Sequence, residues 1–449
     1  MNPELRRNIW LELSPQRLIA LPLILAVTFA LAVGVGGKLG SGHLAIAAAT
    51  IYWLLAIVWG SRLAGDAVAS EIAARTWDSQ RLTPIGPWTM AVGKLTGSTV
   101  FAWLGAGICL SAYVLDNPER LKAAEMAKLV LALAVAALSA QAFALLTSLQ
   151  VLRLRRRGGA VRTTAFQLLG IMSGSLPFVA AFLSFPAGTA IVNVSWFGYA
   201  FVALDFVLFS SLLFLGFTLL GIYHLMRLEL LQRNHPWAWL AFLAVAMAYA
   251  AGHADMLGRA TGSGAFPAAL AASATAALLT YVMAFLEPKD VVQLRQLGQA
   301  LREADLAGVL ARMPRWGLTF IIALGGAASV VALAPEHGAA GTVLRYGQIG
   351  PVVASACCLL ARDVALLLSL GLDSRSRRGE AAAVVYLMVL YLVLPGLLSV
   401  VGLRDVARLL LPVPGWGWPG VLAHGAQAAA ALAIVSLAWR AARRRAAPG

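Results

Sequence analysis

Long apolar runs recur along the whole chain and constrain its fold more than any other feature. A helix needs about 20 apolar residues to cross the hydrocarbon core of a bilayer. Twelve runs of about that length lie at residues 18–37, 43–60, 96–115, 129–151, 165–186, 197–222, 237–254, 267–286, 317–334, 348–370, 381–403 and 421–438. With 60% hydrophobic and 12% charged residues, the chain does not have the composition of a soluble globular protein. The sequence therefore predicts an all-α membrane protein with about twelve transmembrane helices.

The basic residues fall unevenly on the two sides of these runs. With the N-terminus placed inside, 26 of the 35 Lys and Arg residues lie in inside segments and 8 lie in outside segments. Positive charge is concentrated on the cytoplasmic side of membrane proteins. The net charge of +15 therefore reflects topology, and no nucleic-acid partner is predicted. Both termini are expected in the cytoplasm, with the protein in a bacterial cytoplasmic (inner) membrane.

The polar segment between the second and third runs, residues 61–95, has more internal order than a simple tether needs. Val68 and Ile72 are four residues apart, as on one face of a surface helix. Residues that cannot continue a helix then turn the chain back toward the membrane: Pro84, Gly86 and Pro87. Because Glu71 and Arg75 are also four apart, we expect them on one helix face, paired with each other or with a partner.

Eight residues of this segment form a pattern. They are Glu71, Arg75, Thr76, Leu82, Thr83, Pro84, Gly93 and Lys94. The pattern resembles the stretch between the second and third membrane helices of ABC-2 type transporter permeases, although that family often has Gly where Arg75 stands. In that family the helix of this stretch contacts the ATPase subunit. The resemblance extends over residues 1–235, becomes faint beyond them, and implies that the eight residues form an ATPase-coupling element.

The resemblance also implies a function. The chain would be the membrane-spanning permease subunit of an ATP-driven ABC exporter, forming the translocation path and docking a separate cytoplasmic ATPase, expected in two copies. ATP and Mg²⁺ would bind to that partner. The chain itself lacks a phosphate-binding loop, since Gly37-Lys38 and Gly93-Lys94 are each followed by Leu and have no Gly five residues earlier. We therefore expect a transporter subunit rather than an enzyme, with no cofactor or metal of its own.

Ionisable residues inside the runs suggest a second interpretation. Asp205 lies well inside the sixth run and could bind a cation or proton, or pair with a polar neighbour. In the first case the chain would be a twelve-helix secondary transporter driven by an ion gradient, with Asp205 as its coupling site. Arg362 and Asp363 lie in the tenth run, and because they are adjacent on a helix we expect them not to face each other. Arg362 would instead extend to the inner interface.

Residues 1–17 predict an amphipathic helix that lies in the membrane interface. Leu5, Ile9 and Trp10 form one stripe, and charged residues including Glu4 and Arg7 lie opposite. Such a helix places its Trp at headgroup depth and its arginines on the phosphates of membrane lipid.

The order of runs and polar segments repeats after residue 235. Residues 18–235 predict a first six-helix permease domain, and residues 236–449 a second, divergent one with parallel topology. The second domain has its own cytoplasmic amphipathic segment at residues 287–316, where leucines keep helical spacing.

The fifth run and the segment after it carry two further signals. Gly170 and Gly174 are spaced as in helices that approach each other closely. Residues 184–197 are too short and too apolar for a solvated loop, so we expect a half-buried or re-entrant external segment.

Overall fold

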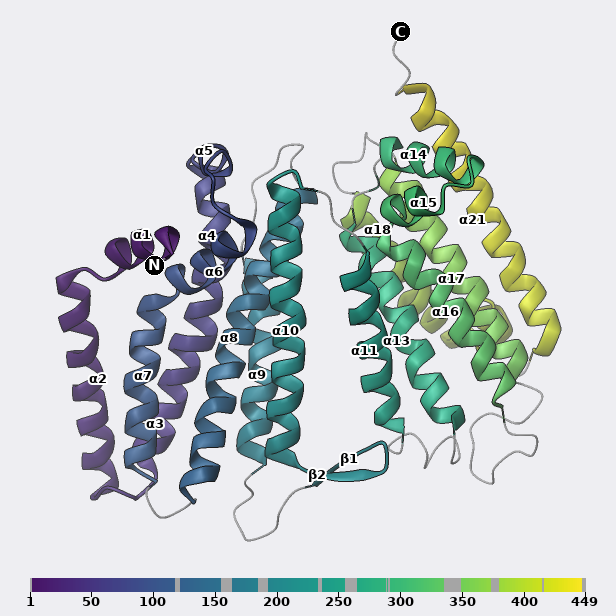
Figure 1. Cartoon of the computed structure of the whole chain (residues 1–449). Helices are drawn as coiled ribbons and strands as arrows, with labels where there is room; N and C mark the ends of the chain where they lie inside the picture. The colour runs from purple at the N-terminus through teal and green to yellow at the C-terminus, as the bar shows by residue number, and fades with distance from the viewer. Residues whose placement is uncertain are drawn as a thin grey trace. The chain divides into compact units, whose positions relative to one another are not determined.

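The computed structural model describes residues 2–117, 122–154, 164–184, 193–232, 236–254, 265–287, 289, 291–334, 349–372, 379–413 and 416–445. These residues form two compact units (Figure 1). Unit 1 contains Met1–Val194 and Ala200–Asn234, and unit 2 contains Ser195–Tyr199 and His235–Gly449. The predicted external segment at 184–197 lies mostly outside the described residues.

Unit 1 is built from helices and contributes to one small hairpin. Its helices are α1 (Pro3–Glu12), α2 (Pro15–Gly36), α3 (His43–Tyr52), the π-helix η1 (Trp53–Trp59), α4 (Gly60–Ala73), α5 (Trp77–Arg81), α6 (Pro87–Ser98), α7 (Val100–Leu115), α8 (Ala123–Leu154), α9 (Thr164–Leu183) and α10 (Ala203–Glu229). Between α9 and α10, strands β1 (Asn193–Trp196) and β2 (Tyr199–Val202) pair in a two-stranded sheet. They are joined by Phe197 and Gly198, which both have positive φ, as a type I′ turn requires.

Unit 2 is a second helical bundle. Its helices are α11 (Trp237–Gly252), α13 (Ala265–Leu286), α14 (Val291–Arg302), α15 (Leu306–Arg312), α16 (Arg315–Ala332), α17 (Ile349–Leu372), α18 (Gly379–Met388), the π-helix η2 (Val389–Val393), α19 (Leu394–Val400), α20 (Arg404–Arg408) and α21 (Gly417–Arg445). The helices α14 and α15 divide the predicted amphipathic segment 287–316 and lie at the end of the bundle where α21 finishes (Figure 1).

The helices are long and apolar enough for a multi-pass membrane protein. Eight helices in the described parts of the chain could cross a bilayer by length and composition, and the pair α6 and α7, bent by 56°, would be a ninth. Three shorter apolar helices, at 167–183, 237–252 and 384–400, coincide with the remaining predicted runs. The all-α membrane class is therefore confirmed, whereas the count of twelve spans and the cytoplasmic placement of the termini stay predictions.

The predicted sixth run begins too early. Its first residues form β2 and the turn before it, and the helix α10 starts only at Ala203. Aromatic residues at the start of that run, Phe197, Tyr199 and Phe201, fit a pleated hairpin as well as an apolar helix, so hydropathy does not separate the two.

The glycine pair of the fifth run packs as predicted. A Cβ added at Gly170 or Gly174 of α9 would lie 2.7 Å from the carbonyl oxygens of Ala140 and Ala136 of α8, respectively. The backbone of α9 at the two glycines therefore lies directly against the backbone of α8, and any side chain larger than that of Gly would clash there.

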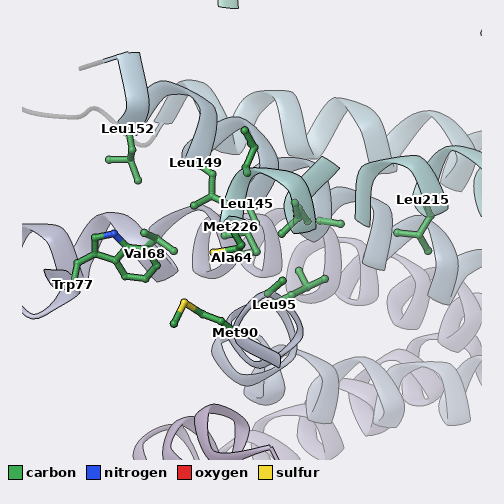
Figure 2. Packing of buried hydrophobic residues seen from close by; sticks show 14 of the residues in the cluster. Ala64, Val68, Trp77, Met90, Leu95, Leu145, Leu149, Leu152, Leu215 and Met226 are labelled. Atoms are coloured by element: carbon green, nitrogen blue, oxygen red, sulfur yellow. The ribbon is translucent and has the colours of Figure 1, made fainter. Parts of the chain in front are cut away.

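The core of unit 1 extends from the membrane helices to the segment between the second and third runs (Figure 2). Val68, Trp77 and Met90 are buried in one cluster with side chains of α8 and α10, including Leu145 and Met226. The polar segment is thus packed against the bundle by its own apolar face, which fixes its position.

Candidate functional site

The helix α4 continues the second span without a break and ends in a left-handed turn. The N–H of Thr76 donates to the carbonyl of Glu71 at 2.9 Å, and the N–H of Arg75 donates to that of Ile72 at 3.1 Å. These two bonds form a Schellman cap, in which the residue at the position of Arg75 takes positive φ. Its φ is 57°, so Arg75 occupies a conformation that favours Gly. This explains physically why Gly suits the position better in the related pattern.

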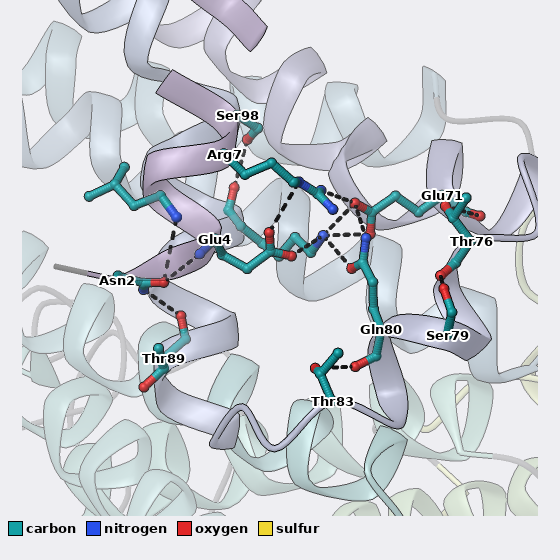
Figure 3. Close-up of polar contacts among 12 residues, drawn as sticks. Asn2, Glu4, Arg7, Glu71, Thr76, Ser79, Gln80, Thr83, Thr89 and Ser98 are labelled. Atoms are coloured by element: carbon teal, nitrogen blue, oxygen red, sulfur yellow. Dashed lines mark hydrogen bonds and ion pairs between the residues drawn. The ribbon is translucent and has the colours of Figure 1, made fainter. Parts of the chain in front are cut away.

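Lys94 of α6 is buried at the centre of a polar network. Figure 3 shows the members of this network around it, among them Glu4, Arg7, Glu71 and Gln80. The Lys94 side chain is only 1% exposed, and its Nζ lies 2.5 Å from Oε1 of Glu71 and 2.8 Å from Oε1 of Glu4. Nζ also donates to Oε1 of Gln80 at 2.8 Å and lies 5.8 Å from the centre of the Trp77 ring. A buried ammonium needs such partners, because an unpaired charge in this position would cost several kcal/mol.

Arg7 of α1 completes the network and balances its charge. Its Nη2 donates to Oε1 of Glu71 at 2.6 Å, and its Nε lies 3.4 Å from Oε2 of Glu4. The amide of Gln80 donates to the same Glu71 oxygen at 2.9 Å. Two cations and two carboxylates therefore share one neutral cluster that joins α1, α4, α5 and α6.

Two glycines of α6 let α1 come close enough to form this cluster. A Cβ added at Gly93 would lie 2.5 Å from Cβ of Glu4, and one added at Gly97 would lie 2.7 Å from the amide of Asn8. At the start of α1, Asn2 accepts the N–H of Glu4 at 3.0 Å and donates to the carbonyl of Thr89 at 2.6 Å. The Gly-Lys pair thus serves both parts of the contact: Gly93 provides the space and Lys94 the charge.

The short helix α5 is fastened to the end of α10. Trp77 is buried, and its indole N–H donates to a carboxylate oxygen of Glu229 at 3.5 Å. Arg81 donates to the carbonyl of the same residue at 2.8 Å. The turn between α4 and α6 is therefore held from two sides, by α1 and by α10.

The other residues of the pattern face outward from this base. Leu82 is 87% exposed, and Arg75, Thr76, Thr83 and Pro84 are exposed as well. Leu82 thus presents a large apolar side chain in the turn between α5 and α6. The eight predicted residues therefore divide into a base, in which Gly93 and Lys94 are buried and Glu71 is half-buried, and an exposed tip formed by the other five.

Two expectations about charges in this region are wrong. Glu71 and Arg75 do not share a helix face, because α4 ends at Ala73 and Arg75 lies in the turn, whereas Glu71 points to Lys94 and Arg7. Glu4 is not on a solvated face of α1 but is 5% exposed. In both cases a partner distant in sequence, Lys94, determines the direction of the carboxylate.

Sequence reasoning missed Arg7, Gln80 and Glu4 as members of this site. Lys94 follows its partner Glu4 by ninety positions, and Glu71 follows its partner Arg7 by sixty-four, so no local spacing connects them. The available signal was Lys94 itself, which stands at the start of the apolar run 96–115. A buried Lys needs a carboxylate nearby, so its position indicated that a partner must exist.

Asp205 lies in the first turn of α10, not deep inside a span. Its side chain is 45% exposed and its Oδ1 lies 2.6 Å from Nζ of Lys128 of α8. An exposed ion pair at a helix end is a common surface feature of small energy. This placement removes the basis for Asp205 as an intramembrane coupling site.

Arg362 and Asp363 form a second buried network, within unit 2. Contrary to expectation the two adjacent residues pair, with Nε of Arg362 donating to Oδ1 of Asp363 at 2.9 Å. Arg362 is buried rather than extended to the interface, and it also donates to Gln427 at 2.6 Å and to the Tyr391 hydroxyl at 3.0 Å. The long arginine side chain folds back along α17 because these partners on other helices hold it.

The second oxygen of Asp363 is satisfied by two phenols. Tyr391 and Tyr281 donate to it at 2.5 and 2.7 Å. Four segments of unit 2, α13, α17, η2 and α21, therefore meet in one neutral polar cluster.

The chain was compared with protein-family models, with curated proteins and with solved structures, and none matches. Within the described residues, no group of three or more His, Cys, Asp or Glu side chains could hold a metal ion.

Proposed function

We propose that the chain is the membrane-spanning permease subunit of an ATP-driven exporter of the ABC-2 type. It would form the translocation path and dock a separate cytoplasmic ATPase, which binds ATP and Mg²⁺, at residues 61–95. The observation that carries this proposal is the division of the patterned residues into a charged base around the buried Lys94 and an exposed tip.

This arrangement suits the transmission of force. The segment α3, η1 and α4 counts as one long helix, His43–Ala73, so a displacement of the tip acts directly on a span. The helix α6 leads into α7. The Lys94 network joins α4 and α6 to α1. A push on α5 by an ATPase would therefore move α1, α4 and α6 together, because ion pairs around the buried Lys94 connect these helices.

The exposed leucine provides the sharpest test. Leu82→Asp places a charge at the centre of the proposed contact without touching the base. We expect at least a tenfold loss of the P-loop ATPase that co-purifies with the epitope-tagged chain from membranes of its host, which corresponds to about 1.4 kcal/mol. The amount of membrane-inserted chain should stay the same.

Leu39→Asp is the matched control. Leu39 is a similarly exposed leucine of unit 1, but it lies in the hairpin between the first two predicted spans. It should leave ATPase co-purification unchanged. Wild-type recovery of the ATPase with Leu82→Asp, or ATP turnover by the purified chain free of other ATPases, would overturn the proposal.

A further inference from the structure

His424 of α21 is buried without a hydrogen-bond partner. Its side chain is 4% exposed, yet neither ring nitrogen makes a hydrogen bond to any described residue. The backbone of Arg408 and Leu409 lies near the ring, but neither ring nitrogen meets the distance and angle of a hydrogen bond with it. Leaving a buried polar group unsatisfied costs about 1–3 kcal/mol. Such a side chain indicates a ligand that completes its bonds.

A small cavity adjoins the ring. Its volume is about 10 Å³, which is room for one species of about the size of a water molecule. The walls include Ser355 of α17, Arg408 of α20, Trp416 and His424. These polar side chains offer O–H and N–H donors, and no carboxylate of the described residues lines the cavity. Because the polar side chains of the wall are donors, they favour an anion.

The charges around His424 are already balanced while its ring is neutral. Arg362 is paired with Asp363 at 2.9 Å, and Arg408 is paired with Asp405 at 2.9 Å. The other polar neighbours, Gln427 beside Arg362, and Tyr391 and Tyr281 beside Asp363, are uncharged. A proton added to His424 would therefore create one excess positive charge next to two arginines, in a segment long and apolar enough to span a membrane. That charge is costly unless an anion accompanies it.

We propose that His424 and its cavity form a site at which one proton and one small monovalent anion, such as chloride, bind together. The protonated imidazole, the Ser355 hydroxyl and the Arg408 guanidinium supply the donors, and the anion restores neutrality. Binding of the two ions is reciprocal, so each raises the affinity for the other by the same factor. The site belongs to unit 2 and is independent of the proposed docking of an ATPase.

Chloride binding to the purified full-length chain in detergent tests this proposal. We would measure binding of ³⁶Cl⁻ at pH 5.5 and pH 7.5 by scintillation proximity, with gluconate as the balancing anion because it is too large for the cavity. Since one proton accompanies each anion, the affinity should rise as the pH falls, by up to about tenfold per pH unit. The variant His424→Gln should lose this pH dependence. His253→Gln is the control, because His253 is a half-buried histidine of the same unit that lies 2.9 Å from the carbonyl of Tyr249. It should bind chloride as the wild type does.

Ser355→Ala keeps the test decisive if His424→Gln does not fold. It removes one donor and should weaken chloride binding several-fold at both pH values while leaving the pH dependence intact. Chloride binding that does not change with pH, equal pH dependence in His424→Gln, or no binding by folded wild-type chain would each overturn the proposal; the last would show that the cavity holds only water.

Discussion

Arg75 holds a backbone conformation that an L-residue with a side chain adopts at a cost. It is the C′ residue of the Schellman cap that ends α4, with φ of 57°. Left-handed conformations cost non-glycine residues about 1–2 kcal/mol. Replacement by Gly removes this cost, but part of the gain in stability is lost because Gly gives the unfolded chain more conformational freedom. We expect Arg75→Gly to stabilise this turn by about 0.5–1 kcal/mol.

Hydrogen exchange measures this effect locally. Amides of residues 71–76 should exchange more slowly in Arg75→Gly than in the wild type, because the cap opens less often. Arg75→Val should accelerate exchange, since a β-branched side chain tolerates positive φ poorly. Faster exchange in Arg75→Gly would show that the arginine side chain stabilises the turn by a contact of its own.

Glu287, at the start of the predicted cytoplasmic segment 287–316, makes the stability of the chain depend on pH. Burial raises the pKa of this carboxyl above its ordinary value of 4.5, and the nearby charge of Arg315 and the N–H of Trp316 only partly oppose this. The folded chain therefore holds the proton more tightly than the unfolded chain. Its stability should fall as the pH rises from about 4.5 toward the raised pKa.

The variant Glu287→Gln removes this pH dependence and keeps an oxygen that can accept the Trp316 N–H. We expect its thermal unfolding midpoint in detergent to exceed that of the wild type by more at pH 7.5 than at pH 4.5. Glu303→Gln, which changes an exposed carboxylate of the same segment, should show no such difference. Parallel pH profiles for Glu287→Gln and the wild type would contradict the assignment.

At the scale of elements, the docking of α1 on α6 depends on backbone proximity. In Gly93→Ala the new Cβ would lie 2.5 Å from Cβ of Glu4, which no real contact permits. The helix α1 must then shift, and its bonds to Lys94 should break. We expect trypsin to cut after Arg6 or Arg7 several-fold faster in the detergent-solubilised variant. Gly107→Ala on α7, where a Cβ meets nothing within 4 Å, should leave the cleavage rate unchanged. Equal rates in both variants would mean that α6 moves and keeps α1 attached.

The elements themselves were largely predictable, and their polar contacts were not. Hydropathy located the apolar helices because a bilayer leaves few alternatives for the backbone. It failed at the start of α10, where aromatic residues fit a hairpin equally well. The amphipathic pattern of residues 1–17 predicted α1, but it did not predict that the charged face with Glu4 packs against α6, where Glu4 pairs with the buried Lys94. Asp205 and Arg362 show the same limit: their partners Lys128 and Gln427 lie more than sixty positions away in sequence.

At the scale of the whole molecule, the two units differ in where they place their buried charges. Unit 1 has its network in the contact of α1 with α4, α5 and α6, which the charge distribution assigns to the cytoplasmic side. Unit 2 has its network on α17, between helices of the bundle.

Parallel halves make a prediction about topology that one set of labels can test. In a background with Cys109, Cys357 and Cys358 replaced by Ala, single cysteines would be placed at four exposed positions: Ser79, Leu39, Glu303 and Asp405. The uneven distribution of Lys and Arg puts Ser79 and Glu303 inside and Leu39 and Asp405 outside. In intact cells a membrane-impermeant maleimide should therefore label only Leu39→Cys and Asp405→Cys. In permeabilised cells it should label all four.

Labelling of Ser79→Cys in intact cells would remove the coupling site from the cytoplasm and with it the proposed function. Labelling of Glu303→Cys instead of Asp405→Cys would show that unit 2 is inverted relative to unit 1, which would exclude a parallel repeat while leaving the docking site of unit 1 in place.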